Sequence, residues 1–520
     1  MATVTTAADG GSHALRRVLR GGVVNLVGTA VGAVLNLALI VMITRALSQE
    51  TAGLLFAATS VFMVAAAVAN VGAPDGLVYF IARMRVFGRA DGVARLLRLA
   101  MGPTVAAACL LGLVLLVFAE PMAQALGTDE AATYLRLLAL FLPFAVLTDT
   151  ALAATRAHHD MSGTAVVEKV GRPLAQVVLV GAVALSGAGG LLALSWAGPY
   201  LPAAVVAWFW LGRVLRRAAP DATTGAQGVA GTAEATGASA VPGRVLDGSL
   251  DVTPRAFWTF ALPRAVAGVA QMGIQRGGVI LVAMLNGLAG AAVFTAATRV
   301  MAVGQFGTQA VLDAAQPRFA EQIATGDHAG VRGLYQVATG WLVCLTWPLY
   351  LGALVFAPEV MRLFGPEYRL GAAALVVVCA GQLAASVLGM GDLILAMTGR
   401  TGLNLLNNVL ALVANVLACL VLVPALGATG AATALVGAVI LRRVLPLWQL
   451  RTLVVLHPFS RPVMTAAASA LVWFAALPAL LTWVMGTGLP TLATAACLGA
   501  LGHLATVWYL RGPLELCPGR

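Results

Sequence analysis

The hydrophobic residues of this chain are grouped in stretches of about 20 positions. Short polar or basic segments separate these stretches. None of these stretches shows the two-residue alternation of a membrane β-strand, and their length suits a helix that crosses the hydrocarbon core. In lipid every backbone N–H and C=O group must be paired within the protein, and a helix pairs its own groups. The pattern therefore predicts an all-α polytopic membrane protein.

Charged and turn residues delimit about fourteen apolar segments. They are 22–43, 52–74, 99–119, 131–155, 164–187, 189–212, 257–285, 288–314, 335–357, 370–397, 402–423, 427–447, 462–484 and 488–510. The first twelve form two sets of six, and the last two form a C-terminal helix pair. The predicted domains are an N-terminal tail at 1–21, an N-terminal lobe at 22–212, a flexible linker at 213–256, a C-terminal lobe at 257–451, and the helix pair with a tail at 452–520.

The two sets of six are copies of one another. At an offset of 238 positions, VFAEPMAQALG at 117–127 aligns with VFAPEVMRLFG at 355–365, and Phe56 and Met63 align with Phe294 and Met301. A repeat of this length is too long for a solenoid unit. Transporters are often built from two such repeats, with the substrate site at the repeat interface. The duplication therefore favours a transporter of two six-helix lobes.

Composition and charge narrow the class further. With 60% hydrophobic and only 10% charged residues, the chain is not a set of soluble domains. If the N-terminus is cytoplasmic, 25 of the 32 basic residues lie in inner loops and tails, and the outer loops hold only Arg45, Arg136, Arg362 and Arg369. The positive-inside rule then predicts a multi-pass protein with both termini cytoplasmic. The expected location is the plasma membrane. The net charge of +11 follows from topology, so no nucleic-acid partner is expected.

Motifs for cofactors and covalent chemistry are missing from the sequence. The six cysteines form no C-x-x-C motif or Cys/His cluster, so we expect neither a disulfide nor a metal site. No Walker-type phosphate loop is present to bind ATP. We therefore expect no cofactor and no enzymatic activity. Transport would be driven by a gradient of H⁺ or Na⁺, or by the flux of substrate, and the sequence does not identify the coupling ion.

Three arginines fall within predicted spans: Arg264 and Arg276 in the seventh and Arg299 in the eighth. An arginine at the centre of a span costs about 2.5 to 3.5 kcal/mol on insertion scales, so such residues usually face a polar cavity or a partner. Arg276 is central and predicts a water-filled chamber, whereas Arg264 and Arg299 could also snorkel or pair structurally. Arg264 and Arg276 are about 18 Å apart along a straight helix and cannot both clamp one phosphate. This cationic surface predicts an anionic ligand.

Four aspartates form two pairs that the repeat matches, the first at the offset of 238 and the second after a five-residue insertion. Asp75 and Asp313 lie near the inner ends of the second and eighth spans, and Asp149 and Asp392 lie in the inner halves of the fourth and tenth. Two interpretations stay open: the aspartates form gate or ion-coupling contacts that change during transport, or they form static salt bridges that both copies inherited.

Several segments resemble a known family. LFGPEYRLGAAALVVVCAG, GDLILAMTGR and LVPALGATGAATA are similar to the second half of the polysaccharide transporters, and residues 25–62 are similar to that family's first two helices. These transporters are oligosaccharide-lipid flippases, such as the O-antigen flippases, within the multidrug/oligosaccharidyl-lipid/polysaccharide exporter superfamily. Arg45 occupies the family's Thr-Arg-x-Leu position.

The resemblance implies two six-helix lobes around a central chamber, with two further helices. It implies that a polyprenyl-diphosphate-linked sugar is moved to the outer leaflet by alternating access, and that Arg45 joins Arg264, Arg276 and Arg299 in binding it. The implied partners are this anionic lipid-linked sugar, membrane lipids, and polysaccharide polymerases and glycosyltransferases.

Three other functions stay open at this point. A cation-coupled multidrug exporter of the same superfamily would favour acidic residues in its chamber, and the three arginines within spans argue for an anionic substrate instead. A membrane glycosyltransferase or polymerase would normally carry a large extramembrane loop or a carboxylate-rich motif. A scaffold without transport activity that recruits envelope-synthesis enzymes is the third.

Overall fold

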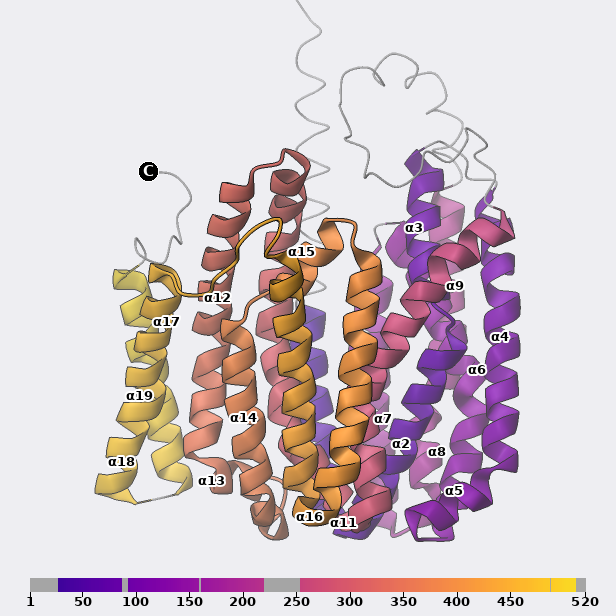
Figure 1. Cartoon of the computed structure of the whole chain (residues 1–520). Helices are drawn as coiled ribbons and strands as arrows, with labels where there is room; N and C mark the ends of the chain where they lie inside the picture. Colours follow the sequence, from indigo (N-terminus) through magenta and orange to yellow (C-terminus); the bar gives the residue numbers. More distant parts are fainter. Residues whose placement is uncertain (1–26, 87–91, 159, 219–252, 487, 511–520) are drawn as a thin grey trace, which may run out of the picture. The chain divides into compact units, whose positions relative to one another are not determined.

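The computed structural model describes residues 27–86, 92–158, 160–218, 253–486 and 488–510 (Figure 1). These residues form helices and connecting turns, and no strand occurs among them. The predicted all-α class is therefore confirmed. The predicted tail at 1–21 and residues 219–252 of the predicted linker lie outside the described residues.

The N-terminal half begins with a helix at Val27–Ala46. The helices that follow it are α2 (Gln49–Ala69), α3 (Ala73–Val86), α4 (Val93–Val117), α5 (Ala119–Leu126), α6 (Glu130–Ala157), η2 (Thr164–Gly171), α7 (Arg172–Ser186), η3 (Gly189–Leu191), α8 (Leu192–Ala197) and α9 (Tyr200–Ala218). The helices of the C-terminal half are α11 (Pro254–Ala324), α12 (His328–Val355), α13 (Ala357–Arg362), η5 (Pro366–Gly371), α14 (Ala372–Val387), α15 (Gly391–Met397), α16 (Thr401–Leu450), α17 (Arg461–Leu471), η6 (Val472–Ala476), α18 (Leu477–Met485) and α19 (Leu489–Tyr509).

Within the described residues, 11 helices are long and apolar enough to cross a membrane. Two of them, α11 with 71 residues and α16 with 50, are longer than a bilayer requires. Each contains one residue with non-helical dihedrals, Gly287 at φ 84° and ψ 170° in α11 and Gly427 at φ 55° and ψ −132° in α16. Each helix therefore consists of two limbs, which meet near the predicted span boundaries. The count of fourteen spans stays a prediction.

Two local departures from the predicted spans involve N-terminal helices. The second predicted span, 52–74, is shorter in the structure, because α2 ends at Ala69 and a turn precedes α3. Gly72 in this turn has φ 71°, and a Cβ there would clash with the carbonyl oxygen of Ala261, so only glycine fits. The fifth predicted span begins with η2, a π-helix that carries Glu168 and Lys169.

The chain divides into two compact units. Of the described residues, the N-terminal unit contains 27–46, 61–86, 92–158, 160–218 and 253–269, and the C-terminal unit contains 47–60, 270–486 and 488–510. Helices α2 and α11 therefore contribute to both units. The core of the N-terminal unit is formed by small and aliphatic residues of α3, α4 and α6 around Phe257, with Leu77, Ile81 and Leu152 fully buried.

The C-terminal unit has a core centred on Phe319, Tyr335 and Ile394, all buried. The C-terminal helices α17, α18 and α19 lie together beside α12, where Val343 packs against Val463 (Figure 1). Polar side chains add to this contact, because a nitrogen of the His503 ring lies 2.8 Å from Ser469 Oγ and the other lies 3.1 Å from the carbonyl oxygen of Cys344. The predicted helix pair is thus anchored to the C-terminal unit.

Candidate functional site

Arg276 and Arg299 lie on the two limbs of α11, on either side of Gly287. They are 11 and 12 residues from this glycine, so each lies about 17 Å from it along its limb. The limbs are neighbours, because a Cβ at Gly278 would lie 3.0 Å from the Phe294 ring. The two arginines therefore lie at a similar depth in the C-terminal unit, and their positive charges interact through space.

The electrostatic surroundings of this arginine pair are unfavourable for two cations. Both side chains are half-buried, and Arg299 Nε is buried without a hydrogen-bond partner. Among the described residues, no carboxylate forms an ion pair with Arg299. Burying a polar group without a partner costs free energy, and a nearby like charge adds to that cost. An anion bound against both guanidinium groups would relieve both penalties.

The other two predicted arginines, Arg264 and Arg45, belong to the N-terminal unit. Arg264 is exposed, its guanidinium carbon lies 3.6 Å from the centroid of the Phe260 ring, and its Nη1 donates to the carbonyl oxygen of Phe260 over 3.3 Å. Phe260 in turn stacks on Tyr79 with 4.2 Å between ring centroids. Arg45 is exposed near the end of the first helix. The structure thus brings Arg276 and Arg299 together and describes Arg264 and Arg45 in a different unit.

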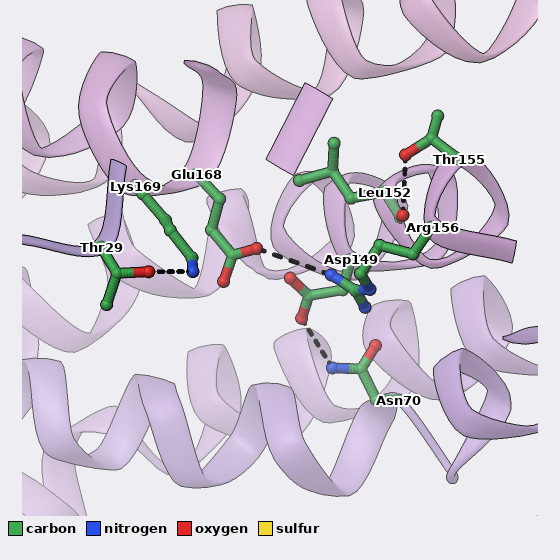
Figure 2. A network of polar contacts seen from close by, with 8 residues as sticks. All are labelled: Thr29, Asn70, Asp149, Leu152, Thr155, Arg156, Glu168 and Lys169. Carbon is green, nitrogen blue, oxygen red and sulfur yellow. Dashed lines mark hydrogen bonds and ion pairs between the residues drawn. The ribbon is translucent and has the colours of Figure 1, made fainter. Parts of the chain in front are cut away.

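Asp149 belongs to a polar network inside the N-terminal unit (Figure 2). Asn70 Nδ2 donates to Asp149 Oδ2 over 2.8 Å, and Arg156 Nη1 lies 3.8 Å from Glu168 Oε2. Lys169 Nζ donates to Thr29 Oγ1. These contacts connect the first helix, the turn after α2, α6 and the π-helix η2. Among the described residues, Asp149 accepts a hydrogen bond from the Asn70 amide and forms no ion pair with an arginine.

Asp392, the repeat counterpart of Asp149, has different partners. Arg443 Nη1 donates to Asp392 Oδ1 over 2.7 Å, and Arg442 Nη2 lies 3.8 Å from Asp392 Oδ2. All three side chains are largely buried, so the carboxylate is neutralised by two guanidinium groups from the second limb of α16. The two matched aspartates have therefore diverged. Asp149 accepts a hydrogen bond from an amide, and Asp392 forms ion pairs with arginines.

Asp75 and Asp313 are both exposed. Asp75 lies in the first turn of α3, where the helix dipole favours a negative charge. Asp313 Oδ1 accepts from Gln309 Nε2 over 2.7 Å. Neither aspartate forms an ion pair within the part of the chain that the structure describes.

Several polar residues were not predicted to have a role. Glu168 lies inside the fifth predicted span next to Lys169, and an acidic residue within an apolar segment is the signal that could have identified it. Four exposed glutamines, Gln271, Gln275, Gln305 and Gln309, lie on the two limbs of α11. Their four-residue spacing within each limb is visible in the sequence, but it does not reveal that they are exposed.

No protein-family model and no curated protein matches this chain. Among solved structures, it is similar to the lipid II flippase MurJ in an inward closed conformation, with a TM-score of 0.71 and 11% sequence identity over 94% of this chain and 99% of that one. It is also similar to an inward-facing multidrug resistance MATE transporter of the MOP superfamily, with a TM-score of 0.61 and 17% identity over 81% and 94% of the two chains.

A third similar structure is a MOP superfamily transporter from Pyrococcus furiosus, for which a reversed polarity of the binding pocket was reported. Its TM-score is 0.54, with 18% identity over 84% of this chain and 95% of that one. At sequence identities this low, the structural similarity establishes a common fold. The chain therefore has the fold of MOP-superfamily transporters, the superfamily that the sequence resemblance indicated.

Proposed function

We propose that this chain uses its transporter fold to move a polyprenyl-diphosphate-linked sugar across the membrane by alternating access. The observation that carries the proposal is the pair of Arg276 and Arg299, two half-buried cations at a similar depth on the two limbs of α11. A diphosphate offers several anionic oxygens, and guanidinium groups bind such oxygens with strong, directional hydrogen bonds. One diphosphate can therefore contact both arginines at once.

The physical task of such a transporter is to keep the headgroup out of the hydrocarbon. A charged group without partners is very costly to place in a medium of low dielectric, whereas a polyprenyl chain is as apolar as the lipid around it. Buried cations replace the hydration that the diphosphate loses. No covalent bond needs to be made or broken, so the proposed activity is transport and not catalysis.

The direction of transport follows from the proposed topology. With the inner loops carrying most of the basic residues, the termini would be cytoplasmic and the chain would lie in the plasma membrane. Glycosyltransferases would then supply the lipid-linked sugar on the cytoplasmic side, and polymerases would consume it outside. Asp392 with Arg442 and Arg443 is our candidate for a gate contact, and Asp149 is our candidate for ion coupling.

The test uses the full-length protein in liposomes that contain a lipid-linked sugar with a fluorescent label on the sugar. We expect Arg276→Gln and Arg299→Gln each to slow the exchange of label between leaflets by at least about tenfold, because a hydrogen bond to a charged group contributes about 1.5 to 3 kcal/mol. Arg318→Gln is the matched control, since Arg318 is an exposed arginine of the same helix. Equal rates for all three variants and the wild type would contradict the proposal.

A second candidate is cation-coupled export of small organic compounds. It is favoured by Asp149, a half-buried carboxylate within a candidate span, which forms no ion pair with another described residue. Liposomes with an imposed gradient of H⁺ or Na⁺ and a fluorescent organic cation test this candidate. Uptake that depends on the gradient and is lost in Asp149→Asn, with no movement of the lipid-linked sugar, would favour export over lipid flipping.

A further inference from the structure

We propose that the exposed glutamines on α11 bind the sugar part of the transported headgroup, whose diphosphate the arginine pair binds at a level closer to Gly287. These residues, Gln271, Gln275, Gln305 and Gln309, are called the glutamine row below. The inference rests on the proposed function, which it extends from the diphosphate to the sugar. It assigns the row a role in selecting among sugars.

The positions of the glutamines along the limbs place them beyond the arginines, as counted from Gly287. Gln271 and Gln305 are 16 and 18 residues from this glycine, so they lie at similar depths, about 8 Å farther along their limbs than Arg276 and Arg299. The first sugar is joined directly to the terminal phosphate, so side chains that extend from neighbouring turns can reach both groups. A headgroup held by the arginines would therefore place its sugar at the level of Gln271 and Gln305.

The helical periodicity also points these two glutamines toward one another. The limbs contact each other where Gly278 meets Phe294. Residues seven or eleven positions apart lie on the same stripe of a helix, so Gln271 shares a face with Gly278, and Gln305 shares a face with Phe294. Both glutamines are nevertheless exposed. No described side chain therefore fills the space over them, although both lie on the faces that the limbs turn toward each other.

The chemistry of the row suits a neutral, hydroxyl-rich ligand. Among the described residues, Gln271, Gln275 and Gln305 form no hydrogen bond, and Gln309 donates to Asp313. An amide without a partner costs about 4 to 8 kcal/mol in hydrocarbon, so this face is not suited to contact lipid tails. Each glutamine offers two donors and one acceptor, which match the hydroxyl groups of a sugar. Because amides are uncharged, they do not compete with the arginines for the diphosphate.

The internal repeat argues that the row does not belong to the shared framework. At the offset of 238, Gln305 and Gln309 align with Ala67 and Val71, between the conserved matches of Met63 with Met301 and Asp75 with Asp313. The N-terminal copy therefore folds with apolar residues at these positions. Packing that is common to both copies does not require the amides, and a ligand that contacts the C-terminal unit accounts for them.

The test compares binding of two kinds of probe to the purified full-length protein in lipid nanodiscs. One probe is a short-chain isoprenyl diphosphate without sugar, and the others carry one hexose, one N-acetylhexosamine or one deoxyhexose on the same diphosphate. We expect at least one glycosylated probe to bind more tightly than the bare one. Gln271→Leu and Gln305→Leu should each lower the affinity for that probe by about fivefold to tenfold, which is the effect of one lost hydrogen bond. The affinity for the bare probe should change by less than about twofold.

Controls separate this inference from the proposed function and from misfolding. Gln124→Leu changes an exposed glutamine of α5 in the other unit and should leave the affinity for every probe unchanged. Thermal unfolding of each variant checks that the fold is intact. If no sugar increases affinity, or if the Gln271 and Gln305 variants weaken bare and glycosylated probes equally, the inference is wrong. If Arg276→Gln leaves the affinity for the bare diphosphate unchanged, the proposed function itself fails.

Discussion

At the scale of single residues, the two aspartates that the repeat matches show what duplication preserves and what it does not. Asp149 and Asp392 occupy equivalent places in the fourth and tenth predicted spans. Asp392 is held by Arg442 and Arg443, whereas Asp149 accepts from Asn70. The sequence predicted that both acids matter, but their partners come from helices far away in the chain. The partners of the two aspartates could therefore be identified only from the structure.

This difference predicts unequal effects of the same substitution. Asp392→Asn removes the counter-charge of two largely buried guanidinium groups, and we expect it to destabilise the protein by about 2 to 3 kcal/mol. In Asp149→Asn, the new side-chain oxygen can still accept the hydrogen bond from Asn70. We therefore expect the free energy of unfolding to fall by less than about 1 kcal/mol. Thermal unfolding in one detergent measures both. If Asp149→Asn lost more stability than Asp392→Asn, the contacts described for the two aspartates would not determine their contributions to stability.

At the scale of elements, glycines determine where the longest helices break. The predicted boundaries near 287 and 427 agree with the structure because both glycines lie between apolar segments. The π-helix η2 was not predicted, because the residues at 164–171 have ordinary helical composition. The turn that separates α2 from α3 was also missed, since it lies inside an apolar run and depends on the contact between Gly72 and Ala261.

The dihedrals at Gly287 predict that an alanine there is strained. Its φ of 84° and ψ of 170° fall in a region that only glycine adopts readily, and a Cβ would meet no atom within 4 Å. The loss is therefore purely conformational, and we expect Gly287→Ala to cost about 1 to 3 kcal/mol. Gly437→Ala is the matched control, because Gly437 lies in α16 with helical dihedrals and open space around it. Equal melting temperatures for the two variants would refute this account of the helix break at Gly287.

At the scale of the whole molecule, the repeat and the hydropathy pattern predicted the class, and the transporter fold bears this out. The assignment of helices to units was less accessible, because the unit boundaries pass through the interiors of α2 and α11. A sequence repeat marks copies along the chain, while units are defined by contacts in space. For the same reason, the pairing of Arg276 with Arg299 could not be predicted from their positions in separate spans.

The proposed topology predicts which turns face the outside. Thr325, in the turn between α11 and α12, would be cytoplasmic, and Leu370, in η5, would be outside. In intact cells, we expect a membrane-impermeant thiol reagent to label Leu370→Cys and not Thr325→Cys, in a background whose native cysteines are replaced. After the cells are opened, both should be labelled. The reverse pattern would place both termini outside and contradict the proposed topology.

The central claim is that Arg276 and Arg299 together hold the diphosphate of a lipid-linked sugar. The most direct measurement is a cryo-electron microscopy structure of the full-length protein in nanodiscs with such a lipid bound. We predict phosphate oxygens within about 2.7 to 3.2 Å of both guanidinium groups. A headgroup bound elsewhere, or an Arg276 side chain that lies against hydrocarbon tails, would contradict the claim.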